Sequence, residues 1–425
     1  MSQSIKSVNF AASDDTLASK DVEAKQDVGP YRSYMIFSAI CQGFCVMINL
    51  HSIFMLAGMA PTVFNVGNFA GVVAFTLEAG ACSVNTLIFW MNALKPWLAV
   101  LVCVLQGLGN VFQIVVVATT EGERGKYFYI AGTAILGIIF GLNSMTSFAL
   151  MAFGPENLLG PFSFGFAIGG VVPFCFSTIL QNTIFTGKEV GNARGIMYCI
   201  LGFVVIMSVV SAINLAIFFT RDPIKKHYLD IKHQGITSIK CTFRLAFKGL
   251  KYAWRIVLIQ FISYVNILTF YPGVVPVSMN MDMGRKVMLI GVFQISETLG
   301  RGIAVFVNPR WLPCNTLNRV LALTICNVGT TVFLFCATIY KTVESINHIA
   351  VVTIGIITFG MVGGYCNSYA DKSIEGEVPR HLDQDVIVST TTVFKIIVSV
   401  FCALGSLTST FLVAAISDSP TPAAH

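Results

Sequence analysis

Eleven long apolar runs limit what this chain can fold into. Each is roughly as long as an α-helix must be to cross the hydrocarbon core of a bilayer. Only 11% of the 425 residues are charged, whereas a soluble globular protein has about 25%. The pattern predicts an all-α polytopic membrane protein with eleven transmembrane helices. The predicted spans are residues 33–59, 65–91, 97–118, 128–153, 159–183, 196–219, 254–274, 286–307, 317–340, 347–369 and 387–415.

Two polar tails and one long loop divide the chain. Residues 1–32 and 416–425 are predicted to be tails, and the first is rich in polar residues, which is typical of disorder. Residues 220–253 form the longest loop. It separates a bundle of six spans, residues 33–219, from a bundle of five, residues 254–415. The second span is interrupted in hydropathy by Glu78 and residues 79–81.

Basic residues predict the orientation of these spans. The central loop carries eight Lys and Arg residues, and Arg255 lies just inside the next span. Because Lys and Arg near spans mark the cytoplasmic side, we expect the loop and the amino terminus to be cytoplasmic and the carboxyl terminus external. In this orientation 18 of the 27 basic residues lie on the cytoplasmic side and seven on the other. The net charge of +6 therefore reports topology, and no nucleic-acid partner is expected.

The eighth predicted span carries charges at membrane depth. Glu297 and Arg301 are four residues apart, and Gln294 precedes Glu297 by three, so all three share one face of a helix. Each such charge costs about 2.5–3.5 kcal/mol even on the lenient insertion scale, so charged side chains rarely face lipid. Two interpretations remain at this stage. The pair either locks two helices together or lines a pathway for a solute.

Other polar residues inside spans come from both halves of the chain. A single Asn or Ser in a span most often joins two helices, but polar positions recur in spans one, two, four, eight, ten and eleven. Such a distribution is typical of a central site between two bundles. The polar residues within these spans include Gln42, Asn49, His51, Glu78, Asn85, Asn143, Ser144, Asn367, Ser368 and Lys395. Lys395 lies near a span end, where its side chain reaches either the interface or the interior.

Neither a metal nor another cofactor is expected. The twelve cysteines lie mostly in apolar runs, and neither a CxxC pair nor a Cys/His cluster with zinc-ligand spacing occurs. In span seven, Pro272 and Gly273 follow an aromatic pair, and a proline at this point kinks a helix. They are candidates for a hinge or gate, with a simple bend at a helix end as the alternative.

Several motifs together resemble the equilibrative nucleoside transporter family. In span eight, residues 293–301 are similar to the family's aromatic–polar–Asp-x-x-x-Arg segment, with Glu297 in place of Asp. Residues 270–273 look like its Leu-Phe-Pro-Gly/Ala turn, and residues 363–368 like its Asn-Gly-Tyr segment. Spans two, four and five add Asn85, residues 141–144 and the glycine-rich residues 163–170. Two positions differ: Ile48 replaces the family's usual Trp, and no Gln follows in span four.

The resemblance implies a fold and a function. The fold would be two bundles, six and five helices, resembling the major facilitator fold. The function would be transport of nucleosides or nucleobases, of purine type, by alternating access in the plasma membrane, with lipid as the surrounding partner. Hydroxyls and ring nitrogens of such a solute need hydrogen-bonding groups. The substrate-binding candidates are Asn49, Ser144, Gln294, Glu297 and Arg301.

The sequence alone leaves other functions open. A carrier of similar architecture for another small polar solute, such as a sugar or an amino acid, fits the same pattern. An intramembrane enzyme is not expected, because no paired aspartates, HExxH or Ser–His arrangement occurs. No P-loop occurs to couple transport to ATP. Transport is therefore expected to be facilitative, with proton coupling through Glu297 or Glu78 as a further hypothesis.

Overall fold

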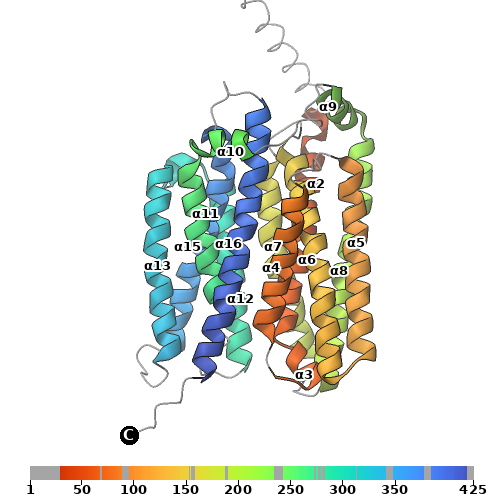
Figure 1. Cartoon of the computed structure of the whole chain (residues 1–425), viewed down its shortest axis with the longest axis vertical. Helices are drawn as coiled ribbons and strands as arrows, with labels where there is room; N and C mark the ends of the chain where they lie inside the picture. The colour runs from red at the N-terminus through yellow and green to blue at the C-terminus, as the bar shows by residue number, and fades with distance from the viewer. Residues whose placement is uncertain are drawn as a thin grey trace, which may run out of the picture.

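The computed structural model is all-helical where it describes the chain (Figure 1). It describes residues 29–67, 69–88, 95–152, 154, 158–186, 190–233, 243–271, 274–275, 279, 283–312, 314–340, 348–377 and 384–418.

Long helices form two bundles that stand side by side, as Figure 1 shows. The amino-terminal bundle consists of α2 (Arg32–Ala57), α4 (Ala70–Ile88), α5 (Pro96–Thr119), α6 (Gly122–Ala152), α7 (Leu159–Thr183) and α8 (Val190–Thr220). The carboxyl-terminal bundle consists of α11 (Trp254–Phe270), α12 (Met283–Phe306), α13 (Leu317–Ile339), α15 (Ile349–Glu377) and α16 (Gln384–Asp418). Helices α4 and α7 of the first bundle pack against α16 and α12 of the second.

The eleven predicted spans correspond to these eleven helices. In the described part of the chain, ten are long and apolar enough to cross a bilayer. Helix α11 is 17 residues long, and it completes the eleven when it is counted with α10 (Phe243–Leu250), from which it is bent by 94°. The all-α polytopic prediction is therefore confirmed, with one span that combines two helices.

Close helix contacts within the amino-terminal bundle depend on glycine. Helices α2 and α7 pack so closely that a side chain at Gly43 would collide with the carbonyl of Phe162. A side chain at Gly165 would likewise collide with the carbonyl of Ile40. Small residues allow such close approach in membrane proteins, where packing rather than water drives helix association. The glycine-rich fifth span thus binds the first.

The structure differs from the sequence pattern at two places. Helix α4 runs unbroken past Glu78 and Gly80, so the interruption in hydropathy is not a break in the helix. The central loop contains two helices, α9 (Asp222–His233) and α10. Short amphipathic segments like these can be helical when one face packs on the bundle below. Ala246 and Leu250 of α10 are indeed buried.

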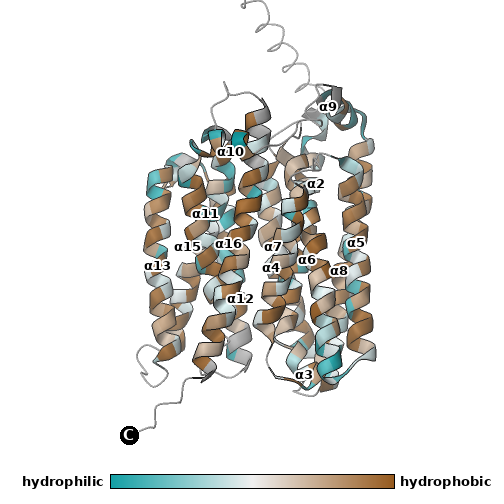
Figure 2. Cartoon of the chain, in the orientation of Figure 1, coloured by the Kyte–Doolittle hydropathy of each residue, from teal (hydrophilic) through white to brown (hydrophobic). Residues whose placement is uncertain are grey.

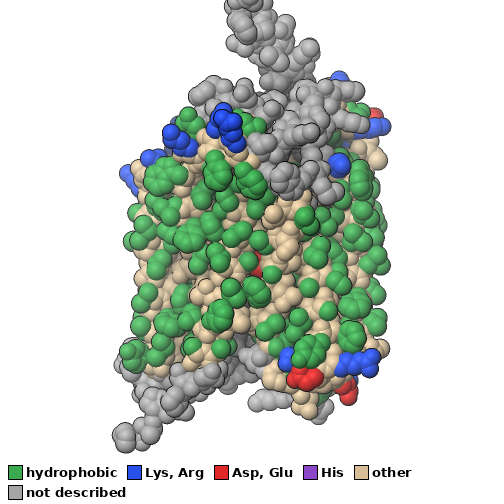
Figure 3. Space-filling model, in the orientation of Figure 1, with side chains coloured by type: hydrophobic (Ala, Val, Ile, Leu, Met, Phe, Trp, Pro, Cys, Tyr) green, Lys and Arg blue, Asp and Glu red, His purple; other side chains and the backbone are tan. Residues whose placement is uncertain are grey.

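The outer surface has an apolar middle and a basic end. Figure 2 shows hydrophobic residues along the outward faces of the long helices. Figure 3 shows the same apolar belt in space-filling form, with Lys and Arg gathered at the end where α9 and α10 lie. We call it the α9/α10 end. An apolar belt with charges at its rims is the surface that a bilayer requires.

Candidate functional site

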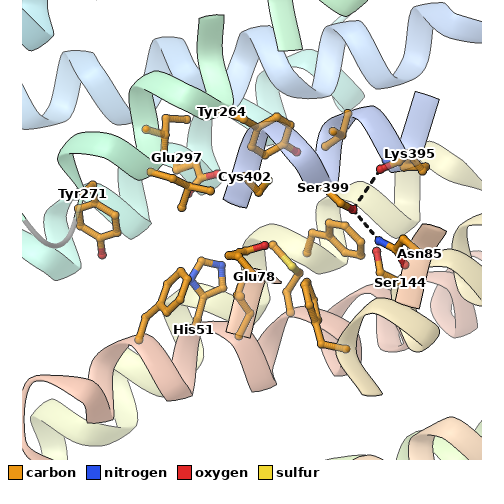
Figure 4. Close-up of a pocket in the computed structure, with 18 of the residues that line it drawn as sticks. His51, Glu78, Asn85, Ser144, Tyr264, Tyr271, Glu297, Lys395, Ser399 and Cys402 are labelled. Carbon is orange, nitrogen blue, oxygen red and sulfur yellow. Dashed lines mark hydrogen bonds between the residues drawn. The ribbon is translucent and has the colours of Figure 1, made fainter. Parts of the chain in front are cut away.

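A cavity lies between the two bundles at the level of the charged residues of α12. About 100 Å³ of it is open to the centres of water molecules, which is room for several waters. Helices α2, α4, α6 and α7 line one side, and α11, α12 and α16 line the other. Its polar lining is His51, Glu78, Asn85, Ser144, Tyr264, Tyr271, Glu297, Arg301, Lys395 and Ser399 (Figure 4).

The ion pair of α12 forms part of this wall. Arg301 Nη2 and Nε donate to the same oxygen of Glu297, at 2.7 and 3.1 Å, as the four-residue spacing predicts. The Arg301 side chain is buried, and its Nη1 has no hydrogen-bond partner among the described residues. One nitrogen of the guanidinium is therefore an unused donor in a residue that lines the cavity.

The backbone beneath the pair is held by close packing of α12 on α15. A side chain at Gly364 would collide with the carbonyl of Glu297, and one at Gly300 with the carbonyl of Met361. These glycines therefore let the α12 backbone approach α15 closely. The close packing fixes the position and orientation of the Glu297–Arg301 pair. Steric crowding between α12 and α15 therefore explains why a glycine precedes Arg301 in the sequence motif.

The other predicted binding residues lie in different places. Ser144 lines the cavity. Asn49 is buried between α2 and α5, where its Oδ1 accepts a hydrogen bond of 2.9 Å from Asn110 Nδ2. Gln294 is buried, and its Oε1 has no partner among the described residues. Neither Asn49 nor Gln294 belongs to the cavity lining. The hinge candidates Pro272 and Gly273 lie outside the described residues.

Aromatic residues form much of the remaining lining. Tyr271 and Phe293 stack with ring centroids 3.8 Å apart and an interplanar angle of 24°. Phe54, Phe140 and Phe166 line the cavity from the amino-terminal bundle. The cavity thus combines polar groups with broad aromatic rings, as small-molecule sites in proteins commonly do.

Two contacts connect the bundles beside the cavity. Asn85 Nδ2 of α4 donates to Ser399 Oγ of α16 across 2.5 Å (Figure 4). Lys395 of α16 lies 3.5 Å from Asp371 of α15, and its Nζ is also 3.9 Å from the centre of the Phe148 ring of α6. Lys395 therefore points into the protein, where it is paired, and not toward the membrane interface.

Sequence reasoning did not single out Tyr264 or Ser399. An aromatic or hydroxyl residue is common in a span: the chain has 12 Tyr. Tyr264 and Ser399 face the cavity because of the way α11 and α16 are turned about their own axes, which only the packing of the two bundles reveals. The sequence shows that His51 and Glu78 are polar residues within spans, but it does not show that both line the same cavity. Among the described residues, no group of His, Cys, Asp and Glu could hold a metal ion.

Comparisons with known proteins give the fold. No family model and no curated protein matches the chain by sequence. A solved structure of the xylose transporter XylE from E. coli, in a partially occluded inward-open conformation, matches with a TM-score of 0.61 at 13% identity over 92% of each chain. The proton:xylose symporter XylE bound to 6-bromo-6-deoxy-D-glucose matches with a TM-score of 0.58 at 14% identity, over 91% of this chain and 88% of that one.

A third structure, a D-xylose-proton symporter, also matches with a TM-score of 0.58 at 14% identity, over 90% of this chain and 89% of that one. The chain is therefore a multi-pass membrane protein with the fold of major facilitator superfamily transporters. The narrower resemblance to equilibrative nucleoside transporters stays a prediction.

Proposed function

We propose that this chain is a transporter that moves a small, neutral solute with a hydroxyl-bearing ring across the membrane by alternating access. The observation that carries the proposal is the Glu297–Arg301 pair on the wall of a cavity between two bundles. Buried charges that face such a cavity mark solute pathways in membrane proteins. The fold supports the same function, because carriers of this architecture bind solutes between their two halves.

Residues from both bundles contribute to binding of the solute in this proposal. Arg301 Nη1 is free to donate to a hydroxyl, and Glu297 holds the guanidinium in place through two hydrogen bonds. Ser144 faces the same space from the opposite bundle. A solute held by both bundles at once would draw them together, and its release would let them separate on the other side.

Two classes of solute share the required ring and hydroxyls. A sugar is the first candidate, because the similar solved structures are described as xylose carriers and one holds a bromodeoxyglucose. A nucleoside is the second, and the aromatic lining supports it. Phe54, Phe140 and Phe166 line the cavity beside the stacked Tyr271 and Phe293, and aromatic rings are the partners that a base stacks on. The motif resemblance favours this second class as well.

Uptake by the purified full chain in liposomes tests the proposal. We expect saturable uptake of labelled xylose or labelled inosine, with competition by members of one class only. Competition by glucose and xylose identifies a sugar carrier, and competition by adenosine, inosine or hypoxanthine identifies a nucleoside or nucleobase carrier. Uptake of every labelled solute at the rate of empty liposomes would overturn the proposal.

We also propose an orientation in the plasma membrane, with the α9/α10 end in the cytoplasm. Basic residues gather at this end (Figure 3), and Lys and Arg favour the cytoplasmic side of a membrane. The amino-terminal tail would then be cytoplasmic, and residues 33–219 and 254–415 would be the two units that move. An epitope tag at the amino terminus should be stained only after cells are permeabilised. Staining of intact cells would contradict this orientation.

A further inference from the structure

Glu78 is a buried acid in the cavity wall that the binding scheme above does not use. It lies near the middle of α4, its residue is 3% exposed, and it faces the cavity (Figure 4). In the part of the chain that the structure describes, no hydrogen bond or ion pair reaches its carboxyl group. Glu297 differs, since Arg301 neutralises it at 2.7 Å. Of the two acids that line the cavity, one is therefore paired and the other is not.

The cations around the cavity are already engaged. Arg301 is paired with Glu297, and Lys395 with Asp371 at 3.5 Å. His51 of α2 is a remaining basic group on the cavity wall (Figure 4). The His51 Nδ1 is buried and has no hydrogen-bond partner among the described residues. Arg301 and Lys395 are therefore both engaged by other acids, and among the described residues no ion pair joins His51 to Glu78.

Helices α6, α16 and α2 pack against α4, and they bring few other titratable groups toward Glu78. From α16, Cys402 and Lys395 line the cavity. Cys82 lies one turn further along α4 itself. Helix α6 carries its charged residues within its first five positions, far from its cavity-lining Phe140 and Ser144. On the helices packed against α4, the titratable groups that line the cavity are therefore His51, Cys402 and Lys395, and Lys395 is paired with Asp371.

An unpaired carboxylate is costly in a low-dielectric interior, and binding a proton removes that cost. A carboxyl group that must be neutral inside the protein, but that meets water when the bundles open, can pick up a proton on one side and release it on the other. We propose that Glu78 is the proton-binding residue of a proton-coupled transport cycle in this chain. The inference rests on the proposed function and names the ion that moves with the solute.

The cycle balances with one proton for each passage. A proton from the more acidic side adds to a Glu78 carboxylate oxygen and gives a neutral carboxyl. The bundles then rearrange with the solute and the proton on board. When the cavity meets the other side, the O–H bond breaks and the proton leaves as hydronium, which restores the carboxylate. No oxidant, reductant or covalent intermediate takes part.

Liposomes with an imposed pH gradient test this inference. When one proton moves with each solute, a gradient of one pH unit supports up to about tenfold accumulation. We expect the wild-type chain to accumulate the labelled solute under an acidic exterior, and Glu78→Gln to lose this accumulation. Gln mimics the neutral acid, so Glu78→Gln should still exchange labelled for unlabelled solute when no gradient is present.

A matched control and a direct proton measurement complete the design. Glu123→Gln removes an acid whose side chain is 60% exposed at the start of α6, and it should keep both accumulation and exchange. Wild-type liposomes with a trapped pH dye should also acidify inside when solute is added outside, a reading that does not depend on the folding of any variant. Full gradient-driven accumulation by Glu78→Gln would overturn the role of Glu78.

The two proposals fail differently in this experiment. Wild-type exchange without gradient-driven accumulation or acidification overturns proton coupling and leaves the carrier function intact. Absence of wild-type exchange for every solute overturns the carrier function, and the proton proposal falls with it. Loss of both exchange and accumulation by Glu78→Gln, with wild-type acidification also absent, likewise excludes coupling.

Discussion

Two clusters of buried polar residues lie a short way apart in this molecule and differ in how their hydrogen bonds are arranged. The first, which we call the Gln42 network, joins α2, α5, α6 and α8. Gln42 Nε2 donates to Asn143 Oδ1 at 2.9 Å and to Ser147 Oγ at 2.6 Å, while Gln42 Oε1 accepts from Ser211 Oγ at 2.6 Å. Asn143 Nδ2 donates in turn to Gln106 Oε1 at 3.0 Å.

The second cluster is the cavity wall, and its hydrogen bonds are incomplete. Within the described residues, Arg301 Nη1 and His51 Nδ1 have no hydrogen-bond partner, and no hydrogen bond or ion pair reaches the Glu78 carboxyl. Burial is similar in the two regions, since Gln42 is 0% and Arg301 2% exposed. Burial alone therefore does not separate a structural cluster from a functional one. A satisfied network specifies how helices pack, whereas donors left open toward a cavity are ready for a ligand.

The largest expected effect is on Arg301. Arg301→Ala removes the unused donor and leaves Glu297 without its cation, so we expect solute uptake to fall by about 10- to 150-fold, since a charge-assisted hydrogen bond contributes about 1.5–3 kcal/mol. Surface expression should persist. Arg301→Ala combined with Glu297→Gln removes the unpaired charge as well, and it should restore thermal stability but not uptake. Normal uptake by Arg301→Ala would refute the role that we assign to this residue.

The next effect concerns stability. Gln42→Leu removes one partner from Asn143, Ser147 and Ser211 at once, and each buried polar group left unsatisfied costs about 1–3 kcal/mol. We expect a lower thermal midpoint, measured by fluorescence-detected gel filtration of the detergent-solubilised protein. Uptake per folded molecule should stay within about twofold of wild type. Lost uptake at wild-type stability would mean that the two clusters do not differ in the way proposed.

The smallest effect concerns the hydrogen bond between the bundles. Asn85→Ala and Ser399→Ala each remove the 2.5 Å contact between α4 and α16. Such a bond contributes about 0.5–1.5 kcal/mol net, so we expect each variant to change the maximal transport rate by about 2- to 10-fold. The double variant should match the single variants, because both remove the same interaction. Additive effects would show that the two residues act independently.

Sequence reasoning predicted what depends on local spacing. The eleven spans follow from runs of apolar residues, and the pairing of Glu297 with Arg301 follows from their separation by one helical turn. What the sequence could not give is which way each helix turns within its bundle. Asn49 and Ser144 read alike as polar residues in spans, yet Asn49 bonds Asn110 inside one bundle while Ser144 faces the cavity.

The same limit applies to the charged residues. Nothing within a span distinguishes Glu78, which has no described partner, from Lys395, whose partner Asp371 comes from another helix. That distinction arises only when α4, α15 and α16 are brought together. The two helices of the central loop were missed for a different reason. These helices are short, whereas the predicted helices depended on long apolar runs.

The central claim is that Arg301 borders a solute pathway shared by both bundles. A structure of the full chain with its solute bound, determined by cryo-electron microscopy, tests this most directly. We expect density for the solute between α2 and α4 on one side and α12 and α16 on the other, with Arg301 Nη1 within hydrogen-bond distance of a solute oxygen. Solute density elsewhere, with Arg301 enclosed by protein and out of reach, would contradict it.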